Sequence, residues 1–284
     1  MLSYRHSFHA GNPADVLKHL VLQRCLIYLT RKDKPLCYID THAGAGAYRL
    51  DGPQARKTGE YRQGIGSLWE QQNLPPLLQE YRALIQAFNP EPELLSYPGS
   101  PWIAAQLLRP QDRLFLHELH ATDAPRLQQL FTTDKRVQVQ ASDGFQGCLG
   151  HLPPIQRRGL VLIDPSYEVK RDYDTVVEVL NKAVRRFATG VYALWYPVVE
   201  RERIRRLEKK LRNSGIPGIQ LFELGLSADG ATSGMTASGM VVINPPYTLK
   251  AEMESVLPWL ARQLGRDGAG HSRCEQLTPE SRPA

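Results

Sequence analysis

Apolar residues recur along this chain in two alternating patterns: short continuous runs and longer stretches with helical spacing. The first helical stretch begins where Asn12 precedes Pro13, because asparagine caps free helix N–H groups and proline suits the first helical position. Its spacing predicts a helix from there to about Leu29. The apolar run 36–40 then predicts a strand, which leads into the glycine turn 40–46, Asp-Thr-His-Ala-Gly-Ala-Gly.

Further short apolar runs, rich in aliphatic and β-branched residues, also predict strands. They are 114–118, 137–141, 160–163, 191–195, 219–224 and 240–243. Amphipathic helical patterns separate most of these runs, the clearest being 123–131, 173–187 and 200–212. Alternation of strand and helix indicates an α/β fold with a parallel sheet. Only a loop of small residues separates the last two runs, so we expect those two strands to pair antiparallel.

One interval is too long for a simple nucleotide-binding unit. In such folds the glycine turn leads straight into a helix, and the next strand follows soon after. Here the next predicted strand begins near Leu114, and a second helix-start signal, Ser100-Pro101, precedes the helical pattern 102–108. We expect three parts: a main α/β domain over 1–50 and 98–265, an inserted small helical subdomain over 51–97, and a flexible tail over 266–284.

Composition narrows the class of protein. The chain has 284 residues, of which 42% are hydrophobic and 23% charged, as in ordinary globular proteins. The net charge of +6 permits a nucleic-acid partner without requiring one. The four cysteines contain no Cys-x-x-Cys pair, which favours buried free thiols in a reducing compartment. No segment fits a signal peptide or a membrane span, so we expect a cytoplasmic protein without a membrane partner.

The predicted ends of three strands carry groups suited to a bound nucleoside. Gly44 and Gly46 let the backbone approach a ligand closely, either a dinucleotide or S-adenosylmethionine, although the third glycine of the dinucleotide pattern is absent. Glu118 is suited to ribose hydroxyls, and Asp143-Gly144 to an adenine ring. The carboxyl ends of parallel strands meet at one edge of a sheet, so we expect an adenosine site there. The alternative is that these acids only cap turns.

The string Asp164-Pro-Ser-Tyr167 follows the run 160–163 and gives the most specific signal. Methylation of an exocyclic amino group is difficult because the nitrogen lone pair is delocalised into the base. Two hydrogen-bond acceptors on its hydrogens favour a nucleophilic geometry, and the Asp164 carboxylate and the Pro165 carbonyl can be those acceptors. Tyr167 can stack on a base that has left its helix. The alternative is an ordinary Asp-Pro turn.

A second string, Asn244-Pro-Pro-Tyr247, matches the general amino-methyltransferase pattern better than the first. It follows the last predicted strand. If that strand runs antiparallel, its end lies at the opposite edge of the sheet from the glycine turn. We therefore assign the chemistry to Asp164 and expect Asn244 to belong to a structural turn.

Two basic clusters could contact phosphate. The segment 201–212 carries seven Lys or Arg in twelve positions, which favours the solvated face of a helix packed on the sheet over a phosphate-binding edge. Arg56, Lys57 and Arg62 form a second cluster inside an otherwise slightly acidic insertion. The chain has eight histidines but no metal-ligand spacing such as His-Glu-x-x-His, so we expect no metal.

Five long strings make the chain similar to one known family. They are Asp15-Val-Leu-Lys-His19, Asp40-Thr-His-Ala-Gly-Ala-Gly46, Tyr97-Pro-Gly-Ser-Pro101, Ala193-Leu-Trp-Tyr-Pro-Val198 and Gly234-Met-Thr-Ala-Ser-Gly-Met240. With them the chain closely resembles the 23S ribosomal RNA adenine-N6 methyltransferase J family, over nearly its whole length. The departure is Ser166, where the usual pattern has a second proline.

The resemblance implies a class I S-adenosylmethionine-dependent methyltransferase with a Rossmann-like, seven-stranded sheet whose last strand is antiparallel. It implies methylation of the N6 amino group of an adenine in 23S rRNA, with S-adenosyl-L-methionine as cofactor. It also implies rRNA as the partner, and we expect a monomer. An older family label, catabolism of external DNA, leaves open a non-catalytic nucleic-acid binding or uptake protein.

The resemblance also implies roles for individual residues. Those that would bind the cofactor are His19, His42, Gly44, Ser100, Glu118, Asp143, Gly144 and Asp164. The catalytic residues would be Asp164, Pro165 and Tyr167. The substrate would contact Tyr4, His6, Lys18 and Tyr167.

Overall fold

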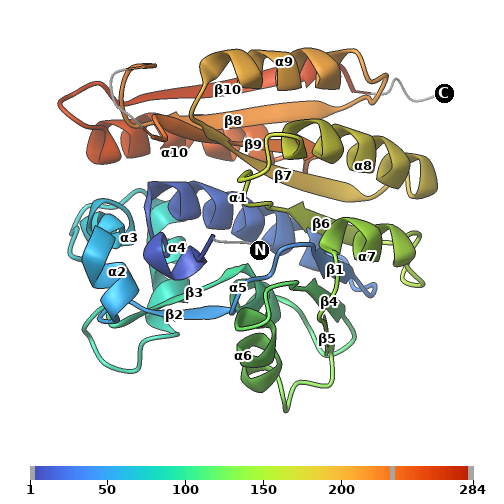
Figure 1. The fold of residues 1–284 in the computed structure, drawn as a ribbon, viewed down its shortest axis with the longest axis horizontal. Helices are drawn as coiled ribbons and strands as arrows, with labels where there is room; N and C mark the ends of the chain where they lie inside the picture. Colours follow the sequence, from blue (N-terminus) through green and yellow to red (C-terminus); the bar gives the residue numbers. More distant parts are fainter. Residues whose placement is uncertain (1–3, 231–233, 281–284) are drawn as a thin grey trace.

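A computed structural model describes residues 4–230 and 234–280 and contains one large sheet with helices on both faces (Figure 1). Its strands are β1 (Cys37–Asp40), β4 (Arg113–His117), β5 (Val137–Gln140), β6 (Gly159–Ile163), β7 (Val191–Val198), β8 (Ile219–Gly225), β9 (Ala237–Ile243) and β10 (His271–Thr278). They lie in the order β10-β8-β9-β7-β6-β1-β4-β5.

The pairing of the strands brings several carboxyl ends together. β1 pairs in parallel with β4 and β6, β4 with β5, and β6 with β7. β9 runs antiparallel to both of its neighbours, β7 and β8. The predicted parallel sheet with an antiparallel closing hairpin is therefore confirmed, and with it the fold class. The carboxyl ends of β1, β4, β5 and β6 form one edge, where a ligand site is expected.

Helices cover the two faces of the sheet through two apolar layers. On one face lie α1 (Pro13–Thr30), α5 (Ser100–Leu107), α6 (Asp123–Leu130) and α10 (Leu249–Leu264). On the other lie α7 (Gly144–Gly150), α8 (Asp172–Arg186) and α9 (Arg201–Arg212). Among the described residues, no helix combines the length and apolar character that a membrane crossing needs.

Helix α1 begins as the sequence predicts, since the Asn12 side chain accepts a hydrogen bond from the Asp15 amide at 2.9 Å. Its residues 13–26 are all buried, polar ones included. The helix is enclosed because it packs on α5, α10 and β9 and also against the insertion. Burial on every side explains why this helix carries charged residues such as Lys18 only where they have partners.

The insertion predicted over 51–97 is helical, with α2 (Pro53–Thr58), the 3₁₀ turn η2 (Glu60–Gln63), α3 (Ile65–Trp69) and α4 (Pro76–Gln86). A short antiparallel pair that the sequence did not predict, β2 (Ala47–Arg49) with β3 (Ser96–Pro98), joins its two ends. Its buried side chains, Ile65, Leu68, Leu78, Tyr81 and Ile85, belong to the same apolar cluster as those of α1. The insertion therefore extends the main core.

The tail predicted over 266–284 contains a regular strand. His271–Thr278 forms β10, an eighth strand that pairs antiparallel with β8. Its only buried apolar residue is Leu277, so the strand lacks the apolar alternation that would reveal it. Charge holds it instead: the Arg273 guanidinium lies 3.0 Å from Glu208 on α9 and 3.5 Å from the fully buried Glu223 on β8. Residues 281–284 lie outside the described part.

Truncation of Arg273 should weaken the attachment of β10. In Arg273→Ala, Glu223 stays buried with only Arg201 and Tyr196 as hydrogen-bond donors, so we expect the free energy of unfolding to fall by about 2 kcal/mol. Urea denaturation would measure this loss. The control Lys210→Ala breaks an exposed ion pair with Asp174 and should change stability by less than about 0.5 kcal/mol. Equal effects of the two variants would contradict the proposed role of Arg273.

Candidate active site

A pocket opens at the carboxyl edge of the sheet and is lined by all eight residues that the family resemblance assigns to the cofactor. Its lining includes His19, His42, Gly44, Ser100, Glu118, Asp143, Gly144 and Asp164. Tyr4, His6, Lys18 and Pro165 line it as well. The side chains come from the N-terminal segment, from α1 and from the ends of β1, β4, β5 and β6, so residues more than a hundred positions apart in the chain form one site.

The glycine turn after β1 is held by Glu118. The amides of Gly44 and His120 each donate to this carboxylate at 2.7 Å, and burial raises the pKa of Glu118. Gly44 has φ +61°, and a Cβ there would lie 2.1 Å from the Tyr48 hydroxyl oxygen. Glycine is thus required for the turn, and the acid at the end of β4 is fixed beside it.

The end of β5 approaches the end of β1 just as closely. A Cβ on Gly144 would lie 1.7 Å from the Thr41 carbonyl oxygen. Asp143 caps α7, its Oδ1 accepting from the Gln146 amide at 3.0 Å. The capping role considered for these acids therefore exists, and it leaves Asp143 in the lining of the pocket.

Asp40 lies beneath the pocket and is fully buried. Its Oδ2 accepts hydrogen bonds from the hydroxyls of Tyr38 and Ser100, each at 2.7 Å. Burial raises the pKa of this carboxyl to about 6, although the hydroxyl donors oppose that shift. The helix-start signal Ser100-Pro101 suggests Ser100 as the N-cap, but the N-cap residue of α5 is Gly99 and Ser100 is already helical. The Ser100 side chain instead ties the start of α5 to the end of β1.

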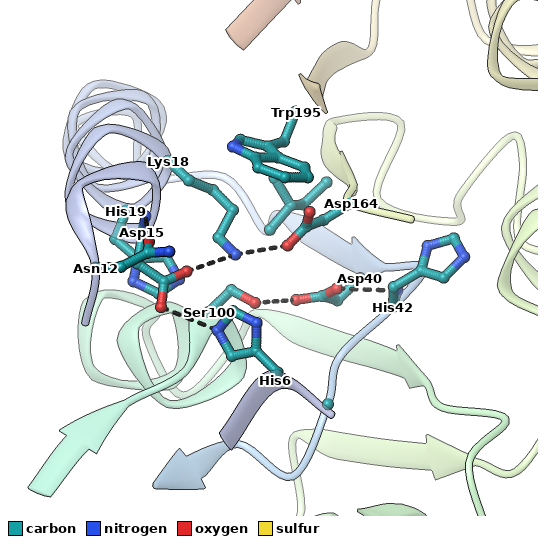
Figure 2. Close-up of polar contacts among 12 residues, drawn as sticks. His6, Asn12, Asp15, Lys18, His19, Asp40, His42, Ser100, Asp164 and Trp195 are labelled. Atoms are coloured by element: carbon teal, nitrogen blue, oxygen red, sulfur yellow. Dashed lines mark hydrogen bonds and ion pairs between the residues drawn. The ribbon is translucent and has the colours of Figure 1, made fainter. Parts of the chain in front are cut away.

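A second polar chain runs from the N-terminal segment to the end of β6 (Figure 2). The Lys18 ammonium lies 2.5 Å from Asp164 Oδ2 and 2.8 Å from Asp15 Oδ1. His6 Nε2 lies 2.9 Å from Asp15 Oδ2, and His6 Nδ1 lies 2.9 Å from the Tyr4 hydroxyl. Three of the four predicted substrate residues, Tyr4, His6 and Lys18, thus belong to one chain that ends on Asp164.

Burial and charge oppose each other at Lys18. Burial lowers the pKa of a lysine, but the carboxylates of Asp15 and Asp164 outweigh burial and raise the pKa of Lys18 above its ordinary value. The ammonium is therefore charged at all physiological pH values and gives Asp164 a fixed positive partner. Sequence reasoning missed Asp15, although its spacing of three from Lys18 on one helix was a usable signal.

The two histidines predicted to bind the cofactor are neutral at physiological pH. Burial lowers the pKa of His19 to about 3 and that of His42 to about 4. His19 Nδ1 lies 2.8 Å from the Tyr97 hydroxyl. His42 lies 2.7 Å from the Thr41 hydroxyl and packs edge-on against Phe145, with ring centres 4.9 Å apart. Both rings thus present uncharged, partly apolar surface to the pocket.

Tyr167 does not line this pocket but lines an adjoining groove, which it shares with Asp164 and Trp195. It has φ +53°, a conformation rare for a residue with a side chain. Its hydroxyl donates to the Trp195 carbonyl at 2.7 Å, and its ring centre lies 4.4 Å from that of Tyr173. The ring is largely buried, so its predicted stacking on a substrate base stays a prediction.

The second Asn-Pro-Pro-Tyr string lies where the antiparallel strand predicts. The Asn244 amide donates to the carbonyls of Ala188 and Gly190 at 2.7 and 2.8 Å, immediately before β7 begins. This is the opposite edge of the sheet from the pocket, and Tyr247 is 87% exposed there. In the described ranges 4–230 and 234–280, no group of three His, Cys, Asp or Glu side chains is arranged to hold a metal.

Comparison with known proteins identifies the family. The family model described as "Ribosomal RNA large subunit methyltransferase D, RlmJ" matches residues 33–278. This chain belongs to that family. Membership confirms the resemblance seen in the sequence and the prediction of a methyltransferase over that of a non-catalytic binding protein.

Relatives of this RlmJ-family chain match it from end to end. "Ribosomal RNA large subunit methyltransferase J" of Escherichia coli (strain K12) is 51% identical over 280 residues, covering 99% of this chain and 100% of the relative. The protein of the same name from Haemophilus influenzae is 52% identical over 281 residues, with the same coverage. A crystal structure of a Legionella pneumophila protein, 41% identical, superposes with a TM-score of 0.88 over 94% of this chain and 98% of that one.

The close approach at Gly144 should not tolerate a side chain. Gly144→Ala places a methyl group against the Thr41 carbonyl, so we expect the free energy of unfolding to fall by about 1–3 kcal/mol. Gly150→Ala is the matched control, because it lies in the same helix with nothing within 4 Å of the added Cβ. Thermal or urea unfolding would compare them. Equal stability of both variants would show that the turn between β1 and α7 adjusts freely.

The raised pKa of Asp40 makes stability depend on pH. The folded protein binds this proton more tightly than the unfolded chain, so the contribution of Asp40 to stability falls as pH rises from about 4 to about 6 and is constant above. Asp40→Asn has no carboxyl group at this position, so its stability lacks this dependence on pH. As pH rises between these values, the free energy of unfolding of wild type should fall by about 3 kcal/mol relative to that of Asp40→Asn. Urea unfolding at each pH measures this difference. If the free energies of unfolding of the two proteins changed with pH in parallel, the raised pKa of Asp40 would be contradicted.

Proposed function

We propose that this chain transfers the methyl group of S-adenosyl-L-methionine to the N6 amino group of an adenine in 23S rRNA. The single observation that carries the proposal is the position of Asp164. It lies between a pocket lined by the strand-end acids Glu118 and Asp143 and a groove lined by Tyr167 and Trp195. A hydrogen-bond acceptor at that boundary can face a cofactor on one side and a base on the other.

The pocket has the chemistry that the cofactor requires. Gly44 and Gly144 leave backbone where a side chain would collide, which lets a ligand approach the strand ends. We assign the ribose hydroxyls to Glu118, the adenine amino group to Asp143, and the apolar faces of the adenine to neighbours such as Phe145 and Leu119. The neutral His19 and His42 add no positive charge against the sulfonium. When bound, the cofactor would supply the electrophilic methyl group.

Asp164 and Pro165 would orient the attacking nitrogen. Each hydrogen of the target amino group would be accepted by one oxygen, the Asp164 carboxylate and the Pro165 carbonyl, which draws the lone pair out of conjugation. Lys18 already contacts Asp164 Oδ2, so Oδ1 is the oxygen left for the substrate. The contact with Lys18 fixes the orientation of the Asp164 side chain at the end of β6.

The choice of 23S rRNA as substrate rests on the relatives, whose names describe large-subunit rRNA methyltransferases. The test is methyl transfer from labelled S-adenosylmethionine to 23S rRNA fragments, DNA and protein in parallel. Labelled N6-methyladenine in one rRNA fragment is the expected product. Label in DNA or protein alone would replace this proposal with another substrate class.

Loss of the Asp164 carboxylate should abolish turnover. Asp164→Asn keeps the size of the side chain but removes its charge, and we expect kcat to fall by about 100-fold or more, measured by methyl transfer to the rRNA fragment. Cofactor affinity, followed by calorimetry, should fall much less than kcat, because Glu118 and Asp143 still line the pocket. The control Tyr247→Ala changes the exposed tyrosine of the second motif and should retain wild-type activity. An active Asp164→Asn beside an inactive Tyr247→Ala would reverse the assignment of the two motifs.

A further inference from the structure

The groove beside the pocket has a basic rim that the proposed reaction does not use. It begins at Asp164, passes the aromatic side chains of Tyr173 and Trp195, and reaches Lys170 and Arg203. Arg203 comes from α9, whose seven basic residues the sequence alone could not divide into structural and functional ones. A groove that combines cations with aromatic rings, on which bases can stack, is typical of sites for single-stranded nucleic acid.

Position in the groove separates Arg203 from the other cations of α9. Arg201 points inward, with its guanidinium 2.8 Å from the buried Glu223. Arg205 pairs with Glu202, and Lys210 lies 2.5 Å from Asp174. Within α9, all of which the structure describes, Arg203 is the residue that lines the groove.

An exposed carboxylate marks the place where an anion would bind. Glu200 precedes α9 and accepts from Arg203 Nε at 2.7 Å. The Arg203 hydrogen bond lowers the pKa of Glu200, and the charge of Lys170 lowers it further. Both cations line the groove together with Glu200. A phosphate group carries similar charge and more acceptor oxygens, so it can take the place of that carboxylate.

Acidic side chains line the groove as well, among them Glu60, Glu168 and Glu200. Glu60 lines the groove near the N-terminal segment, where His9 and Asn12 each contact it at 3.0 Å. The basic residues of the insertion, Arg56, Lys57 and Arg62, line neither the pocket nor the groove. Lys170 and Arg203 are therefore the cations best placed to act on a strand whose base reaches Asp164.

We propose that this groove binds the RNA strand beside the target adenine. A backbone phosphate is held between Lys170 and Arg203, and the neighbouring nucleotide packs against the rings of Tyr173 and Trp195. This inference rests on the proposed function and names the RNA-contacting surface of the same site. Phosphate contact of this kind positions the strand without reading its sequence.

Charge reversal tests the proposal directly. Arg203→Glu and Lys170→Glu should each weaken binding of a labelled 23S rRNA fragment about ten-fold or more, and reduce the slope of log affinity against log salt by about 1. Fluorescence anisotropy at several salt concentrations measures both quantities, and KM for RNA should rise in parallel. The matched control is Lys209→Glu, an exposed position of α9 outside the groove, which should bind RNA as wild type does.

A third variant changes affinity in the opposite direction. Glu200→Gln removes the carboxylate that competes for Arg203, so RNA binding should tighten about two- to five-fold. Thermal melting checks that each variant is folded, and calorimetry should show unchanged affinity for S-adenosylmethionine. If Arg203→Glu and Lys170→Glu match Lys209→Glu in RNA affinity, the proposal is wrong. Wild-type protein that binds rRNA through these residues but transfers no methyl group would instead contradict the proposed function.

Discussion

The site depends on the two ion pairs of the buried Lys18 ammonium. A charge that deep in a protein is tolerated only with partners, and Lys18 has two, Asp15 on its own helix and Asp164 at the end of β6. The pairing fixes α1 against the sheet at the one strand end that carries the acceptor. Through Asp15 and His6 it also holds the N-terminal segment over the pocket.

The insertion packs against α1 and against the N-terminal segment. Its core is continuous with that of α1, and Tyr97, at its exit, bonds both His19 and Tyr81. Glu60 in the insertion contacts His9 and Asn12 at the start of the chain. The N-terminal segment, the insertion and α1 are thus joined around the pocket, which places residues distant in sequence within one hydrogen-bonded region.

Charge has a different role at the far end of the sheet. Glu223, Arg201 and Arg273 join β8, α9 and β10 inside the protein, while Arg203 of the same helix faces the groove. This helix, with seven basic residues among twelve, therefore contributes both to packing and to a candidate binding surface. The division follows from the direction of each side chain around the helix axis.

The sequence by itself determined the order of helices and strands, the site of the insertion and the strand ends that carry Glu118, Asp143 and Asp164. These features depend on local periodicity and turn chemistry, which short segments contain. Tertiary structure alone decided that His271–Thr278 is a strand, that Ser100 binds Asp40, that Asp15 joins Lys18 to His6, and that Arg203 faces the groove. The strand pairing of His271–Thr278 and the contact of Ser100 with Asp40 depend on partners more than 40 residues away, which no local pattern encodes. At Asp15 only the spacing of three from Lys18 was a local signal.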